Sequence, residues 1–145
     1  MSEGKSINIF VKTNQTDAEG KKSDMEFFVE GSYIEKGHTE YITYKESELA
    51  GMEGTTTTIK ISPNCLSIIR FGSITTKLDF ILGAVTSSIY ATPYGQLDIS
   101  IDTKLLEIDI DEDGKSTIEL RYTLDSGLEQ ILDNEMFISF ERADT

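Results

Sequence analysis

The residue types that most often carry chemistry are scarce in this chain of 145 residues, which has one cysteine, one histidine, two prolines and no tryptophan. The lone Cys65 can form neither an intramolecular disulfide nor a cysteine-rich metal site, which fits a reducing compartment. We expect Cys65 to be a packed, inert thiol and His38, beside a glycine turn, to be exposed. The sequence therefore assigns no catalytic residue, no metal site and no cofactor.

Long apolar runs and glycine-rich phosphate loops are also missing. No stretch of about 18 apolar residues could span a membrane as a helix. The segment 1–12 is polar and strand-like and lacks the pattern of a signal peptide. No G-x-G-x-x-G or G-x-x-x-x-G-K motif occurs. We expect a cytoplasmic protein that does not enter membranes.

Basic residues are half as frequent as acidic ones, 13 against 26, which gives a formal net charge of −13. Residues 98–145 alone contain 14 acidic and 4 basic side chains, a net charge of −10. A field of this sign repels phosphate backbones and anionic lipid, so nucleic acid and membrane surfaces are not expected partners. The acidity either serves solubility or favours a basic protein partner.

Alternation of apolar and polar residues with a period of two dominates the sequence, as in Ile7, Ile9 and Val11. Three more strictly alternating runs cover 97–101, 106–110 and 118–124, and less regular strand-like segments cover 24–35, 40–46, 55–62, 66–71, 74–82, 87–92 and 135–142. Gly, Pro, Asn and Asp separate them, as turns require. We predict one all-β domain over residues 1–145, with about 8–11 antiparallel strands and little helix.

A closed or nearly closed barrel is favoured over a sandwich, because closure removes the exposed strand edges on which chains aggregate. Two short segments differ from this strand pattern. Ser126–Glu129 fits either a capping box that opens a helix towards Leu132 or a hairpin turn, and 46–53 is expected to hold a single helical turn.

The run Asp109-x-Asp111-x-Asp113-Gly114 begins like a calcium-binding loop. Its twelfth position is Leu120 rather than the glutamate that completes calcium coordination, and its flanks alternate like strands. We interpret the segment as a β-hairpin.

Four segments are distinctive together with Gly51: Tyr-Ile-Thr-Tyr-Lys-Glu (41–46), Thr-Thr-Ile-Lys-Ile (57–61), Arg-Phe-Gly (70–72) and Tyr-Ala-Thr-Pro-Tyr-Gly (90–95). In these segments the chain resembles the YwiB-like family, bacterial domains of unknown function. The resemblance implies a calycin-like (lipocalin-like) β-barrel and an intracellular location. It implies no activity, cofactor or partner.

Arg70 is the first candidate ligand-binding residue, because it lies in a strand that is apolar on both faces and therefore points into an enclosed space. A buried guanidinium needs acceptors. Either a ligand carboxylate or phosphate provides them, or an internal carboxylate such as Glu46 does. The phenols of Tyr44, Tyr90, Tyr94 and Tyr122 are candidates to line the same pocket.

Two functional hypotheses follow from these residues. The first is a barrel that binds a small ligand, an anionic one included, in its interior through Arg70, Glu46 and the four tyrosines. The alternative is a non-enzymatic interaction or accessory module that uses its acidic outer surface. An enzyme is the least favoured class, because no pair of carboxylates stands out. The oligomeric state is left open.

Overall fold

The computed structural model describes residues 4–46, 54–63, 65–111, 114–127 and 131–143. They form ten strands: β1 (Lys5–Thr16), β2 (Lys22–Lys36), β3 (Thr39–Lys45), β4 (Thr56–Ser62), β5 (Cys65–Phe71), β6 (Thr76–Phe80), β7 (Val85–Thr92), β8 (Gly95–Asp109), β9 (Ser116–Asp125) and β10 (Ile131–Arg142). Across the described ranges there is no helix, and hence none long and apolar enough to cross a membrane. The all-β prediction is confirmed.

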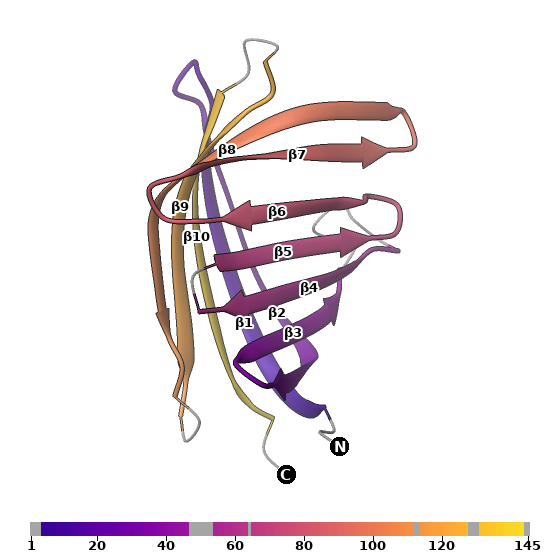
Figure 1. Cartoon of the computed structure of the whole chain (residues 1–145), viewed down its shortest axis with the longest axis vertical. Helices are drawn as coiled ribbons and strands as arrows, with labels where there is room; N and C mark the ends of the chain where they lie inside the picture. The colour runs from indigo at the N-terminus through magenta and orange to yellow at the C-terminus, as the bar shows by residue number, and fades with distance from the viewer. Residues whose placement is uncertain (1–3, 47–53, 64, 112–113, 128–130, 144–145) are drawn as a thin grey trace.

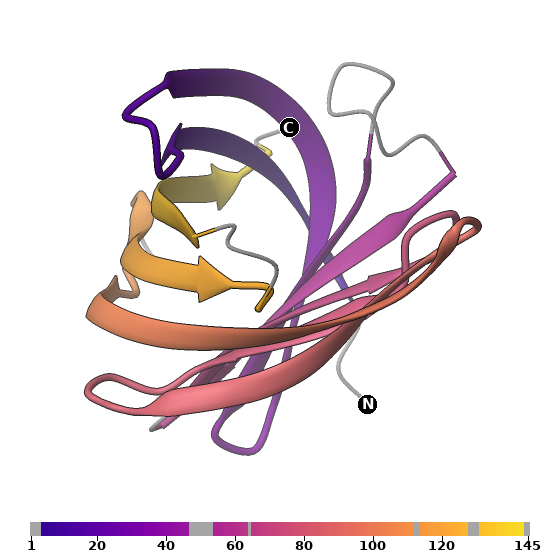
Figure 2. The ribbon, with the colours of Figure 1, turned by 90° about the horizontal axis from the view of Figure 1, so that it is seen from above.

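The strands form one antiparallel sheet that curls into a nearly closed barrel (Figures 1 and 2). The order is β6-β5-β4-β3-β2-β1-β10-β9-β8-β7, so the first and last strands of the chain pair in its middle. In the β1–β10 register Ile7 lies opposite Arg142. The two termini therefore lie at the same end of the barrel (Figure 1).

The barrel closes at a seam between the edge strands β6 and β7, which share one bridge, Thr75–Ala91, instead of a full ladder. Side-chain hydroxyls take the place of backbone donors there. Thr86 donates to the carbonyl oxygen of Asp79 (2.6 Å), Ser88 to that of Lys77 (2.5 Å) and Thr76 to that of Ile89 (3.2 Å). These bonds satisfy carbonyl groups that an open sheet edge would leave to solvent.

Alternation places one face of every strand inside the barrel. The fully buried apolar side chains come from eight of the strands and include Ile9, Ile42, Ile59, Leu66, Ile68, Phe80, Ile101, Ile118, Leu120 and Ile138. The ring of Phe80 packs on Tyr122 with centroids 4.7 Å apart. The middle of the barrel is thus filled by side chains, which leaves its ends for polar groups.

The single strand β8 contains both alternating segments 97–101 and 106–110, which the sequence pattern presents as two strands. Thr103 pairs with Tyr122 of β9 and Leu105 pairs with the adjacent Arg121, so Lys104 is an additional residue, a β-bulge. The bulge changes which positions face inward, from Ile101 before it to Leu106 after it. This change of phase broke the alternation and explains why one strand was expected to be two.

The hairpin interpretations of two connections are supported. β10 begins at Ile131 opposite Asp125 of β9, so of the two alternatives for this segment the hairpin fits and a helix continuing to Leu132 does not, while 128–130 lie outside the described residues. Asp109 pairs with Thr117, which makes the calcium-like segment a β8–β9 connection, as predicted. The turn expected at 46–53 falls almost wholly on residues that the structure does not describe.

Candidate functional site

Inward-facing polar side chains gather at both ends of the barrel. At one end, a cluster around Arg70 lies beside the connections β3–β4 and β5–β6. At the other, an open pocket lies beside the termini and the β8–β9 connection. The two places are described in turn.

The Arg70 cluster joins three adjacent strands. Arg70 of β5 lies opposite Thr57 of β4, and Glu46 follows the last residue of β3. Arg70 Nε lies 3.8 Å from Glu46 Oε2, and the Thr57 hydroxyl donates a hydrogen bond of 2.5 Å to the same oxygen. The side chain of Glu46 is 1% exposed and that of Arg70 14%. Glu46 is therefore a buried carboxylate, and Arg70 is the cation beside it among the residues that the structure describes.

The cluster retains unused hydrogen-bonding capacity. Within the described part of the chain, neither Glu46 Oε1 nor Arg70 Nε has a hydrogen-bond partner, although both atoms are buried. Buried polar atoms of this kind are normally satisfied by protein or by water. The cluster thus has the composition of a structural ion pair with two hydrogen-bonding positions unused among the described residues.

Two buried tyrosines adjoin the cluster. Burial raises the pKa of the Tyr44 phenol above its ordinary value of 10.0, and the charge of Glu46 raises it further, while Arg70 acts in the opposite direction. Burial also raises the pKa of Tyr122, again opposed by Arg70. Both phenols are therefore held in the neutral form.

These shifts predict a loss of stability in alkali. Because the folded pKa values are raised, the unfolded chain releases protons first; the stabilisation is complete below pH 10 and declines as the pH rises towards the folded values. Each tyrosine should contribute about 1.4 kcal/mol per pH unit to the decline. Urea unfolding from about pH 9 to about pH 11.5 measures the slope.

Tyr44→Phe and Tyr122→Phe should each lower that slope by about 1.4 kcal/mol per pH unit. Tyr94→Phe is the matched control, because Tyr94 is 99% exposed at the β7–β8 turn. Equal slopes for all three variants and the parent protein would contradict the assignment.

The structure brings together part of the predicted site. Arg70, Glu46 and Tyr44 form one cluster with Tyr122 within electrostatic range. Of the two alternatives for Arg70, the structure shows the contact with Glu46, at 3.8 Å. Tyr90 is half-buried against the apolar core, and Tyr94 faces solvent. Tyr94 therefore lies outside the cluster.

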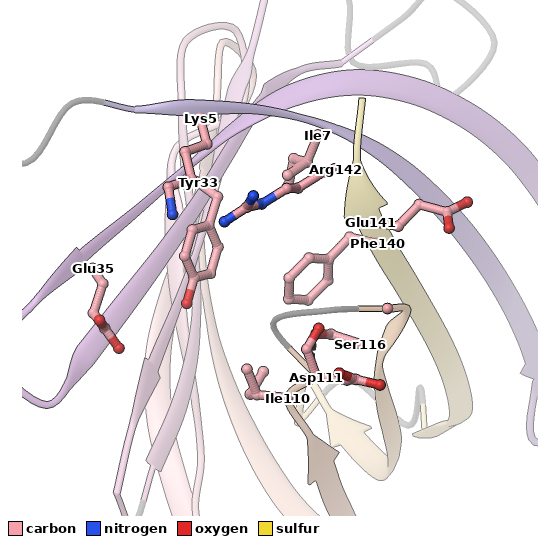
Figure 3. A pocket seen from close by; sticks show the side chains of 11 residues that line it. Lys5, Ile7, Tyr33, Glu35, Ile110, Asp111, Ser116, Phe140, Glu141 and Arg142 are labelled. Carbon is pink, nitrogen blue, oxygen red and sulfur yellow. Dashed lines mark hydrogen bonds between the residues drawn. The ribbon is translucent and has the colours of Figure 1, made fainter. Parts of the chain in front are cut away.

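The pocket at the other end has a volume of about 200 Å³ and opens to solvent (Figure 3). Its lining comes from β1, β2, β10 and both sides of the β8–β9 connection: Lys5, Ile7, Tyr33, Glu35, Ile110, Asp111, Gly114, Ser116, Phe140, Glu141 and Arg142. Ile7 and Phe140 are buried and give it an apolar floor. The rings of Tyr33 and Phe140 pack in a tilted arrangement with their centroids 5.9 Å apart.

Two cations stand at the mouth of this pocket. Lys5 and Arg142 extend towards the Tyr33 ring from adjacent strands, and Glu141 points away from them (Figure 3). Among the residues that the structure describes, neither cation has a carboxylate within 4.0 Å. The lining also contains three carboxylates, Glu35, Asp111 and Glu141.

None of the residues predicted to bind a ligand lines this pocket. The alternation of inward and outward residues could have indicated Lys5 and Arg142 from the sequence. Lys5 continues the inward phase of Ile7 and Ile9, and Arg142 continues that of Ile138 and Phe140. Their proximity depends on the pairing of the first strand with the last, which no local pattern reveals.

Comparisons with known proteins agree with the fold and leave the activity unassigned. Residues 9–138 match the family described as a domain of unknown function, DUF1934. The chain is 30% identical over 135 residues to the uncharacterized β-barrel protein YwiB of Bacillus subtilis, covering 93% of this chain and 92% of the relative. It also matches the crystal structure of the B. subtilis ywiB protein with a TM-score of 0.86 and 26% identity, over 99% of this chain and 96% of the other.

Sequence and structure thus point to the same group of β-barrel proteins over nearly the whole chain. The chain belongs to the DUF1934 family.

Proposed function

We propose that the protein binds a small ligand with an apolar body and an anionic head in the pocket beside its termini. The supporting observation is the pair of unneutralised cations, Lys5 and Arg142, above the floor of Ile7 and Phe140. Both side chains are exposed and have no carboxylate within 4.0 Å among the described residues, so a bound anion could pair with them.

The dimensions of the pocket limit the ligand. A volume of about 200 Å³ is below the roughly 300–1,000 Å³ of sites that hold drug-sized molecules. A short-chain or single-ring carboxylate or phosphate fits this limit. The apolar part would lie on Phe140 and Ile110, and the head between the two cations.

The probe for this proposal is octanoate, compared with octanol and octylammonium, which keep the chain and change the charge of the head. Titration of isotope-labelled protein should move amide signals around Ile7 and Phe140 with octanoate, and weakly or not at all with the other two. Arg142→Gln and Lys5→Gln should each weaken octanoate binding by roughly 10-fold or more, since a hydrogen bond to a charged group contributes about 1.5–3 kcal/mol.

Lys115→Gln is the matched control, because Lys115 is an exposed cation at the same end of the barrel that does not line the pocket. It should bind octanoate like the parent protein. Equal affinity for octanoate and octanol, or unchanged binding by Arg142→Gln, would refute the proposal.

A further inference from the structure

Aromatic side chains are exposed together on the outer wall of the barrel. Three phenylalanines, Phe10 of β1, Phe28 of β2 and Phe137 of β10, form an outer aromatic stripe across adjacent strands. Phe10 and Phe28 are cross-strand partners with ring centroids 4.8 Å apart, and Phe10 lies 6.4 Å from Phe137. Phe28 is 82% exposed.

The three phenylalanine rings are not part of the barrel core. Their strand neighbours Ile9, Val11 and Ile138 are the buried, inward residues, so the alternation turns Phe10, Phe28 and Phe137 outward. Single exposed apolar residues are ordinary on protein surfaces, but a contiguous group is typical of an interaction site. Aromatic side chains are also enriched at such sites.

The charges around the stripe are predominantly negative. Lys12 is paired with Glu26 at 3.7 Å and Arg121 with Glu135 at 3.5 Å, so these two cations are already neutralised. The carboxylates of Glu30, Glu119 and Glu141 have no cation within 4.0 Å in the described part of the chain. All three lie in β2, β9 and β10, the strands that contain or border the stripe.

A shallow depression of about 150 Å³ extends the stripe beyond Phe137 towards β8 and β9. Leu105, Leu120 and Met136 line it, together with the carboxylates Glu119 and Glu135 and the cations Lys12 and Arg121. Because both cations are already paired, with Glu26 and Glu135, Glu119 is the lining carboxylate that has no cation within 4.0 Å among the described residues. The depression has room for an apolar side chain of a partner beside Glu119.

We propose that the outer aromatic stripe is a docking surface for a basic polypeptide segment that carries apolar side chains. Lysine or arginine residues of the partner pair with Glu30, Glu119 and Glu141, and its apolar side chains cover Phe28 and Phe10. Charge complementarity selects this occupant. A second copy of the chain would set the same carboxylates against each other at a net charge of −13 each, which opposes self-association.

The test uses a fluorescent synthetic peptide in which lysine alternates with phenylalanine, with two matched peptides that replace lysine by glutamate or phenylalanine by alanine. Fluorescence anisotropy should show that the lysine–phenylalanine peptide binds and that the two matched peptides do not. The affinity of the lysine–phenylalanine peptide should fall as the salt concentration rises from about 0.05 to 0.5 M. Phe28→Ser should lower its affinity at least 10-fold, since truncation of a central aromatic residue commonly costs this much. Glu30→Lys should lower it as well.

Phe71→Ser is the control, because Phe71 is an outward residue of β5 that is 75% exposed and lies away from the stripe. It should bind the peptide like the parent protein. Absence of binding, or equal loss in Phe28→Ser and Phe71→Ser, would overturn the proposal. So would sedimentation of a dimer, or binding to phosphatidylcholine vesicles, that Phe28→Ser abolishes, because the occupant would then be a second copy or a lipid surface.

Discussion

Arg70→Met is expected to lower the free energy of unfolding by about 3–5 kcal/mol, the usual cost of removing one partner of a buried ion pair. The side chain of Glu46 is 1% exposed, and Arg70 is the cation that lies beside it, at 3.8 Å. After the substitution the Thr57 hydroxyl still donates to Glu46 Oε2, but one neutral donor does not offset a buried charge. Urea unfolding monitored by circular dichroism measures the loss.

The two partners should not contribute equally. Glu46→Gln leaves Arg70 without its carboxylate, but the Arg70 side chain keeps 14% of its exposure and hence some contact with water. We expect Glu46→Gln to be less destabilising than Arg70→Met. In the double variant Arg70→Met/Glu46→Gln no buried charge remains, and part of the stability lost in Arg70→Met should return. Additive losses in this cycle would show that the pair is not coupled.

Octanoate binding by Arg70→Met separates a structural role of Arg70 from a ligand-binding one. Arg70 does not line the pocket beside the termini, so the folded variant should bind octanoate like the parent protein. Loss of binding in a variant that remains folded would relocate the ligand to the Arg70 cluster, as the first functional hypothesis from the sequence had it. The proposed pocket would then be wrong.

Local sequence patterns predicted which side chains of a strand face the interior of the barrel. The alternation of Ile7, Ile9 and Val11 correctly predicted an inward face, and the apolar neighbours of Arg70 correctly indicated enclosure. Pairing with Glu46 was one of two alternatives, because the sequence contains the acceptor but not the strand order that brings it within 3.8 Å.

The sequence did not predict contacts that depend on the order of the strands, nor the direction of side chains in turns. Lys5 and Arg142 meet because β1 pairs with β10, with Ile7 opposite Arg142, a register between the two ends of the chain. Tyr94 belongs to a turn, where the period of two no longer specifies which way a side chain points. The bulge at Lys104 likewise follows from pairing with β9 and is not marked by glycine or proline.

Gly72→Ala should be destabilising by about 2–5 kcal/mol, because backbone strain and steric overlap add. Gly72 has a φ of 145°, a conformation that side chains other than glycine's rarely adopt. A Cβ there would overlap the carbonyl oxygen of Gly54 and lie 2.8 Å from Thr55 Cα. Gly95→Ala is the matched control, since Gly95 has a φ of 140° and an added Cβ there meets no atom within 4 Å.

Gly72→Ala should also displace Glu46, because Thr55 contacts both the β5–β6 turn and Glu46. The Thr55 carbonyl accepts the backbone N–H of Glu46 at 2.8 Å, and Thr55 Oγ1 contacts Ser73 Oγ at 2.8 Å. Displacement of Thr55 by a methyl group at position 72 would move Glu46 away from Arg70. Gly72→Ala and Arg70→Met should therefore be less than additive, whereas Gly95→Ala and Arg70→Met should add. Simple additivity in both pairs would mean that the β5–β6 turn does not position the buried carboxylate.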